Sequence, residues 1–203
     1  MIRTNEQAPA LKLPLFNTKT NTSTDGDSDD HNASAWFDTK DLKQDSKMTI
    51  IVFFRGKHCP ICINYLADIE SKYDDILNSG MRIVAASMDD AERTSRTAQA
   101  VSNKLGNKVD SLRLPLAYGL TMEQAREWGL FLSSARDGST EPSVFSEPGL
   151  FVLDSLSGKV FMASIQSAPF TRPDIGQLLD GLEYAVLNKY PARGTYHDDE
   201  KDE

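Results

Sequence analysis

Two cysteines separated by two residues, Cys59 and Cys62, are the clearest chemical feature of the sequence, and they are its only cysteines. They follow an apolar run and a basic turn, and Pro60 between them suits the first position of a helix. The free backbone N–H groups and the positive dipole end of a helix start favour negative charge. A thiol at such a junction is prepared to be a thiolate, so the spacing predicts redox chemistry.

The cysteine pair suits reactivity better than structure or metal binding. Cysteines this close cannot join distant segments, and a reducing compartment disfavours structural disulfides. The pair is half of a tetrahedral zinc site, but no second pair of ligands follows at a matching spacing. Nitrogen ligands would have to come from His31, His58 and His197. We therefore expect neither a metal nor an organic cofactor.

Length and charge limit the remaining classes of protein. A chain of 203 residues with 39% hydrophobic content can bury one substantial core, so we predict a single domain over residues 1–196. The net charge of −8 argues against nucleic acid or an anionic membrane as the main partner. No segment approaches the roughly 18 apolar residues of a membrane span, which predicts a soluble, cytoplasmic protein.

Two strand and helix units must position the cysteines. Residues 48–54 form a continuous β-branched and aromatic run, which is typical of a strand covered on both faces. From Pro60 onwards, apolar residues recur at helical spacing until Gly80 ends the helix. A second buried strand is expected at 82–87 and a second helix at 89–104. The cysteines thus lie between a central strand and the helix that follows it.

The segments on either side of these units add further elements. Residues 8–16 predict an edge strand or extended lead-in. Trp36 and its neighbours are expected to return the chain to the core through a short turn or helix. Residues 112–117 predict another strand, and 121–128 a helix that starts with a capping box formed by Thr121 with Gln124.

The last third of the chain predicts an antiparallel end to the sheet. Residues 133–147 are polar and interrupted by Gly and Pro, so we expect a loop. The runs 149–154 and 159–165 flank a turn and predict a β-hairpin, and 174–187 predicts a closing helix. The sheet is therefore expected to be mixed.

Two polar segments are expected to lie outside the core. Residues 17–34 are rich in Asn, Thr, Ser and Asp, which predicts a mobile acidic loop insertion, and 197–203 predict a frayed acidic tail. The loop could bind calcium through Asp25, Asp27 and Asp29, but it lacks the later Gly and bidentate Glu of an EF-hand loop.

Taken together, these elements resemble the thioredoxin fold, and specifically peroxiredoxin-like proteins of the alkyl hydroperoxide reductase and thiol-specific antioxidant (AhpC/TSA) type. Residues 53–62 are similar to the Phe-x-Arg-Gly-x-x-Cys-Pro-x-Cys of such proteins, and 148–154 read Pro-Gly-Leu-Phe-Val-Leu-Asp. The resemblance implies an α/β fold in which helices flank a central mixed sheet on both faces.

The departures from the peroxiredoxin pattern fall at the peroxide-binding groups. Typical peroxiredoxins carry Pro-x-x-x-Thr/Ser-x-x-Cys and a later arginine, but here Val52 replaces the proline and Gly56 the hydroxyl residue. Pro148 falls about where that arginine would be, at the place of a proline that is usually cis in thioredoxin-like proteins, although X–Pro bonds are more often trans. Backbone groups beside it, including Gly149, would then pair with an extended substrate. Arg172 reads as part of a helix start, and it is also a candidate for the missing arginine.

The resemblance implies a thiol-dependent oxidoreductase. Cys59, expected to be the more exposed cysteine, would attack a small peroxide, and Cys62 would resolve the product to a Cys59–Cys62 disulfide. Arg55, Lys57 and His58 can lie near Cys59 and lower its pKa. An external thioredoxin or glutathione system would reduce the disulfide, and a homodimer is a candidate assembly.

Three alternatives stay open at this point. Because the hydroxyl is missing at Gly56, a protein disulfide reductase is the main alternative to the peroxidase. Cys62 could instead be a small buried residue beside a lone nucleophilic Cys59. A thioredoxin-fold adaptor without turnover is the third alternative, although a pure scaffold has no need of two reactive thiols.

Overall fold

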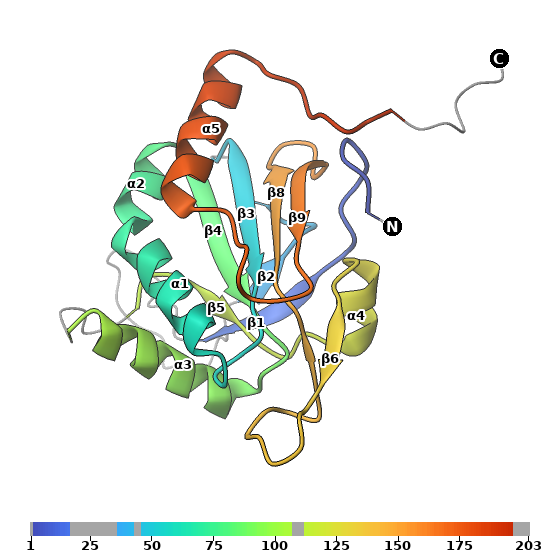
Figure 1. Ribbon diagram of the computed structural model, residues 1–203. Helices are drawn as coiled ribbons and strands as arrows, with labels where there is room; N and C mark the ends of the chain where they lie inside the picture. Colours follow the sequence, from blue (N-terminus) through green and yellow to red (C-terminus); the bar gives the residue numbers. More distant parts are fainter. Residues whose placement is uncertain (1, 17–35, 43–45, 107–111, 197–203) are drawn as a thin grey trace, which may run out of the picture.

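The computed structural model describes residues 2–16, 36–42, 46–106 and 112–196. Within these ranges, a seven-stranded mixed sheet has the strand order β2-β1-β5-β4-β3-β8-β9 (Figure 1). Its strands are β1 (Lys12–Phe16), β2 (Trp36–Asp38), β3 (Met48–Phe53), β4 (Met81–Ala86), β5 (Leu116–Ala117), β8 (Gly149–Asp154) and β9 (Val160–Ile165). The predicted mixed sheet is confirmed: β3 and β5 run parallel to β4, and the other neighbouring pairs are antiparallel.

The strand before the cysteines, β3, is the best-covered element of the sheet. It lies between β4 and β8, and all six of its residues are buried. Ile50 and Val52 face one hydrophobic cluster, while Ile51 and Phe53 face the other. The continuous apolar run therefore reflects a strand with packing on both faces, as the sequence indicates.

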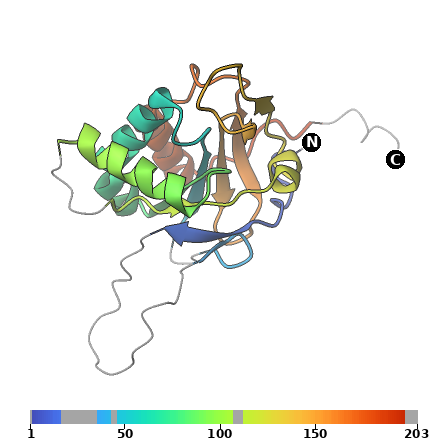
Figure 2. The same cartoon turned by 90° about the horizontal axis from the view of Figure 1, so that it is seen from below.

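Helices cover the two faces unequally (Figures 1 and 2). One face is covered by α1 (Pro60–Ser71), α2 (Tyr73–Asn78), α3 (Ala91–Lys104) and α5 (Ile175–Leu187). The other face packs against the single short helix α4 (Met122–Glu127), Trp128 and the N-terminal segment. The prediction of helices on both faces is confirmed. Among the described residues no helix is long and apolar enough to cross a membrane.

Three local predictions need correction. The expected loop 133–147 contains a two-stranded antiparallel sheet of β6 (Leu132–Ser134) and β7 (Val144–Ser146). These strands are too short and polar to show an alternating apolar pattern, so backbone pairing alone reveals them. Trp36 lies in β2 with its side chain 53% exposed, although a turn or helix was expected there. The helix after Pro60 is divided at Lys72, where α1 ends and α2 begins.

Other predictions agree with the structure or fall outside it. The capping box of Thr121 and Gln124, the final hairpin and the closing helix are all present. The strand expected at 112–117 is limited to Leu116 and Ala117. The acidic loop insertion 17–34 and the tail 197–203 lie outside the described residues.

Candidate active site around two cysteines

The turn between β3 and α1 delivers the cysteines to a helix start, as the sequence predicts. Gly56 takes a φ of +124°, its carbonyl accepts a hydrogen bond from the Cys59 N–H at 3.1 Å, and Pro60 begins α1. Cys59 is the N-cap residue of α1, and its Sγ accepts the N–H of Cys62 at 3.2 Å. One free N–H group of the helix start therefore points at the sulfur, which favours a thiolate there.

The two cysteines are joined in a disulfide, with their Cα atoms 5.2 Å apart. Both are buried: the exposed fraction is 3% for Cys59 and 0% for Cys62. The expected order of exposure holds by a small margin. Cys59 therefore keeps a small exposed surface, whereas Cys62, on the buried side of α1, has none.

A buried carboxylate occupies the space beside Gly56. A Cβ atom at Gly56 would lie 2.6 Å from Oδ2 of Asp89, which follows the end of β4. That oxygen accepts the backbone N–H of Lys57 at 2.7 Å, and Oδ1 accepts Arg93 Nε at 2.7 Å. Asp89 therefore holds the turn and fills the place where a Thr or Ser side chain would begin.

Arg55 is held by the β6–β7 segment. Its Nη2 donates to Glu141 at 3.2 Å, its Nε lies 3.5 Å from Glu147, and its guanidinium stacks over the Phe145 ring at 4.6 Å. Hydrogen bonds from the backbone and side chain of Arg136 lower the pKa of Glu141 to about 2, so Glu141 is ionised at neutral pH. The positive charge of Arg55 is therefore balanced by two carboxylates.

His58 lies beside the same aromatic ring. Its ring centroid is 4.6 Å from that of Phe145, and in the described part of the chain both ring nitrogens are buried without a hydrogen-bond partner. Burial, followed by the charge of Arg55, lowers the pKa of His58 below 6.5. The imidazole is therefore mainly neutral at pH 7 and offers a hydrogen bond rather than a positive charge.

Arg172 comes from the segment before α5 and reaches the cysteines. Its Nη2 donates to Cys62 Sγ at 3.0 Å, and its guanidinium lies 5.1 Å from the centre of the Tyr65 ring. The Tyr65 hydroxyl donates to the carbonyl of Pro173 at 2.9 Å, which ties α1 to this segment. Burial lowers the pKa of Arg172 to about 10, so the guanidinium is still charged at neutral pH. The arginine that the sequence left undecided lies at the site.

The Pro148 segment lies in the sheet next to the disulfide turn. None of the peptide bonds in the described ranges is cis, so Pro148 differs from the cis proline that the resemblance implied. The carbonyl of Pro148 accepts the N–H of Gln166 at 3.0 Å, and Gly149 pairs with Phe53 in β3. These backbone groups are therefore more fully used within the sheet than the resemblance implied.

Buried polar atoms without a hydrogen-bond partner gather in this region. Eleven such side-chain atoms occur among the described residues. Eight of them belong to the disulfide turn, the segment before Pro148, Gln166 or Arg172: Arg55 Nε, His58 Nδ1 and Nε2, Ser146 Oγ, Glu147 Oε2, Gln166 Oε1, and Arg172 Nε and Nη1. Arg55 Nε and Glu147 Oε2 form an ion pair with each other at 3.5 Å, so the other six are the atoms that still need a partner. Unpaired buried polar groups are rare and need an explanation, and a bound substrate or water would supply the missing partners.

Sequence reasoning missed several of these residues. Asp89 had a usable signal, because the carboxyl ends of neighbouring parallel strands meet at one edge of a sheet, and it follows the strand beside β3. The sequence indicated Tyr65 and Glu147 more weakly. Tyr65 lies about one helical turn after Cys62, and Glu147 directly precedes Pro148. Glu141 and Phe145 had none, since they were assigned to a loop.

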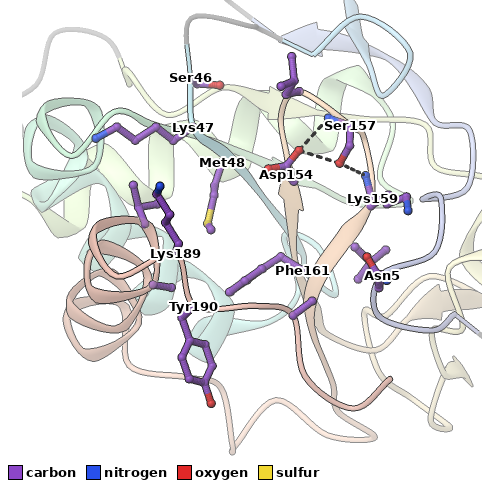
Figure 3. Close-up of a pocket in the computed structure, with 15 residues that line it drawn as sticks. Asn5, Ser46, Lys47, Met48, Asp154, Ser157, Lys159, Phe161, Lys189 and Tyr190 are labelled. Carbon is purple, nitrogen blue, oxygen red and sulfur yellow. Dashed lines mark hydrogen bonds between the residues drawn. The ribbon is translucent and has the colours of Figure 1, made fainter. Parts of the chain in front are cut away.

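The described residues contain a cavity away from this site but no cluster suited to a metal ion. In the ranges that the structure describes, no group of three or more His, Cys, Asp or Glu side chains could hold a metal ion. A cavity of about 630 Å³ is lined by Met48, Lys189 and Tyr190, among others (Figure 3). Met48 begins β3 whereas the cysteines follow its end, so this cavity lies at the opposite end of the sheet.

Comparison with known families and curated proteins gives one match. The family model described as the AhpC/TSA family matches residues 4–160. No curated protein matches the chain.

Several solved structures that resemble the chain are peroxiredoxins. A cysteine-to-serine mutant of peroxiredoxin 6 of Arenicola marina has a TM-score of 0.73 at 13% identity, covering 98% of this chain and 81% of that chain. Enterococcus faecalis AhpC has a TM-score of 0.66 at 16% identity, covering 93% of this chain and 95% of that chain. A yeast mitochondrial 1-Cys peroxiredoxin, whose thiol is resolved via glutathione/thioredoxin systems, has a TM-score of 0.67 at 14% identity. The match covers 98% of this chain and 84% of that chain. At these identities the likeness establishes the fold.

Proposed function

The chain belongs to the AhpC/TSA family, and we propose that it is a thiol peroxidase with Cys59 as the nucleophile and Cys62 as the resolving thiol. The observation that carries the proposal is the Cys59–Cys62 disulfide at a helix start, surrounded by buried polar atoms that lack partners. Such a site has the groups to activate a thiol and to bind a small polar substrate.

The first step is oxidation of Cys59. Its thiolate, favoured by the N–H of Cys62 and the dipole of α1, attacks the terminal oxygen of a peroxide ROOH. The O–O bond breaks, the RO⁻ group leaves and takes up a proton, and Cys59 becomes a sulfenic acid. A neutral His58, whose ring nitrogens lack partners in the described ranges, is suited to hydrogen-bond the peroxide or the leaving oxygen.

The second step is resolution within the same helix turn. The Cys62 thiolate attacks Sγ of the Cys59 sulfenic acid, the S–O bond breaks, and hydroxide leaves and is protonated to water. Little movement is required, because Cys62 lies one turn into α1 from the N-cap Cys59. The disulfide that results is the form seen here.

The surrounding residues receive roles according to their contacts. Arg172 is assigned to Cys62 Sγ, to which its Nη2 donates, and to the substrate, since Nε and Nη1 have no acceptor among the described residues. Arg55 and Lys57 remain thiolate-stabilising candidates, although Arg55 is paired with Glu141 and Glu147. Pro148 and Gly149 are assigned to the wall of the site. The adaptor alternative is disfavoured because so many unpaired buried groups surround the thiols.

A protein disulfide reductase is the second candidate function, and one observation favours it. The carboxylate of Asp89 fills the space beside Gly56, where peroxiredoxins carry the hydroxyl that binds peroxide. In this reading Cys59 attacks a substrate disulfide, and Cys62 then releases the mixed disulfide.

Rapid oxidation kinetics separate the two functions. The reduced protein is mixed with hydrogen peroxide or with cumene hydroperoxide, and thiol loss is followed by stopped flow. We expect oxidation far faster than that of a free thiol, abolished in Cys59→Ser, and a trapped sulfenic acid in Cys62→Ser that reacts with dimedone. If peroxide reacts no faster than with free cysteine while insulin disulfides are reduced, the second candidate replaces the first.

The substrate, the reductant, the cellular location and the assembly of the protein are also part of the proposal. We propose a small peroxide as substrate, and a thioredoxin or glutathione system as reductant by analogy with the yeast peroxiredoxin. A cytoplasmic location fits a pair of thiols that must be reduced in every cycle. A homodimer remains part of the proposal, and sedimentation of the reduced and oxidised protein tests it.

A further inference from the structure

The arginine that contacts Cys62 has a part in the return of the enzyme to its reduced form. We propose that Arg172 stabilises the thiolate of Cys62 as the leaving group when an external thiol opens the Cys59–Cys62 disulfide. This inference rests on the proposed function, because it concerns the second half of that catalytic cycle. It assigns Arg172 to the resolving sulfur rather than to the nucleophile.

The contact becomes stronger as the reaction proceeds. Arg172 Nη2 donates to Cys62 Sγ at 3.0 Å. A disulfide sulfur is a weak acceptor, whereas a thiolate is an anion that forms a charge-assisted hydrogen bond. An interaction that strengthens while the S–S bond breaks lowers the barrier, since it is greater in the transition state than in the ground state.

The guanidinium of Arg172 is held in place by neighbouring residues, and its charge is available to a thiolate. The Tyr65 ring lies against it, and the Tyr65 hydroxyl binds the carbonyl of Pro173, the next residue along the chain. Within the described ranges Nε and Nη1 of Arg172 have no hydrogen-bond partner, so no carboxylate engages the guanidinium directly. Arg55 differs, because two carboxylates already balance its charge.

Exposure sets the direction of attack. Cys62 is fully buried, whereas Cys59 keeps 3% of its surface exposed. An external thiolate therefore attacks Sγ of Cys59, the S–S bond breaks, and the electron pair goes to Sγ of Cys62 beside Arg172. A second external thiolate attacks the external sulfur of this mixed disulfide and releases the Cys59 thiolate. Two external thiols become one disulfide, and the enzyme gains two electrons.

The first experiment measures reduction of the disulfide directly. Wild-type protein and the variant Arg172→Met are oxidised with diamide, so the result does not depend on peroxide being the physiological oxidant. Reduction by dithiothreitol is then followed by alkylation and mass spectrometry. We expect Arg172→Met to be reduced about tenfold more slowly. The equilibrium constant for reduction should also fall about tenfold, which makes the reduction potential about 30 mV more negative.

Matched variants separate this role from a structural one. Arg193→Met removes another arginine that lies over a tyrosine ring, far from the cysteines in sequence, and should leave rate and potential unchanged. Arg172→Lys retains the charge and should recover part of the potential. Unchanged rate and potential in Arg172→Met would overturn the proposal, and so would an equal loss in Arg193→Met.

A second experiment tests which sulfur is attacked. In Cys62→Ser the remaining Cys59 should react with the aromatic disulfide DTNB, whereas Cys62 in Cys59→Ser should react at least tenfold more slowly because it is buried. Faster reaction at Cys62 would reverse the assigned direction of attack. If peroxide oxidation fails while these results hold, the proposed peroxidase function is wrong and the role of Arg172 stands.

Discussion

Two buried polar regions of the molecule are built in opposite ways. At Glu70 on α1, the carboxylate accepts the backbone N–H groups of Arg113 and Leu114 and the Nε of Arg113, and its side chain is 1% exposed. Around the disulfide, Arg172, His58 and their neighbours leave eight buried atoms without hydrogen-bond partners in the described residues.

The difference distinguishes polar groups that stabilise the fold from groups that wait for a ligand. Every oxygen of Glu70 is used, so the group fixes the segment before β5 against α1 and has nothing to offer a substrate. A partly satisfied cluster carries an energetic penalty, and it persists where chemistry requires it. Substitutions at the first region should therefore alter stability, and those at the second should alter chemistry.

The largest expected effect on stability is at Glu70. Replacement by Ala leaves two buried N–H groups and part of a guanidinium without their acceptor, so Glu70→Ala should lower the free energy of unfolding by about 3 kcal/mol. Urea denaturation measures this, with Glu92→Ala, an exposed ion-pair residue, as a control expected to change by less than about 0.5 kcal/mol. A large change in thiol reactivity with unchanged stability would contradict the distinction.

Restoring a hydroxyl beside the cysteines should come next. Gly56→Thr forces a branched residue to a φ of +124° and against Asp89, and should destabilise the protein by about 2–3 kcal/mol without raising peroxide reactivity. The double variant with Asp89→Ala should recover only part of the stability, because the backbone strain remains. Thermal unfolding and peroxide kinetics provide the measurements, and a stable, faster Gly56→Thr variant would disprove this account of the turn.

Two serines make the sharpest matched pair. Ser155 shares hydrogen bonds with Ser46 at 3.0 Å and Thr49 at 2.8 Å, so Ser155→Ala should lower the free energy of unfolding by about 1 kcal/mol. The buried hydroxyl of Ser146 has no partner among the described residues, so Ser146→Ala should be neutral or slightly stabilising. Chemical denaturation of both variants compares a paired and an unpaired hydroxyl. Equal losses would contradict the distinction between paired and unpaired buried polar groups.

The smallest expected effect is the pH dependence contributed by His58. Because its folded-state pKa lies below the unfolded value of 6.5, the unfolded chain binds the extra proton first as the pH falls. His58 should therefore reduce stability progressively below pH 6.5, from a level that is constant above it. In His58→Asn the free energy of unfolding should fall less between pH 6.5 and 5. A steeper fall in the variant would mean that the folded state favours the charged imidazole.

Much of the fold could be predicted from local patterns. The buried run at β3, the helix start at Pro60 and the capping box at Thr121 depend on neighbouring residues along the chain, and all three are present. The strands β6 and β7 were missed because they are short and polar, and their pairing is a property of two segments together.

The chemistry of the nucleophile could also be predicted from the sequence, because a thiol between a strand and a helix start is activated by backbone groups next to it in the chain. The side chains that contact the two cysteines and their turn could not be predicted in this way. Arg172 lies 110 residues from Cys62, and Asp89 lies 32 residues from Lys57, and folding alone brings each pair into contact. Packing of distant segments therefore decided which arginine meets a sulfur, and which side chain fills the space beside Gly56.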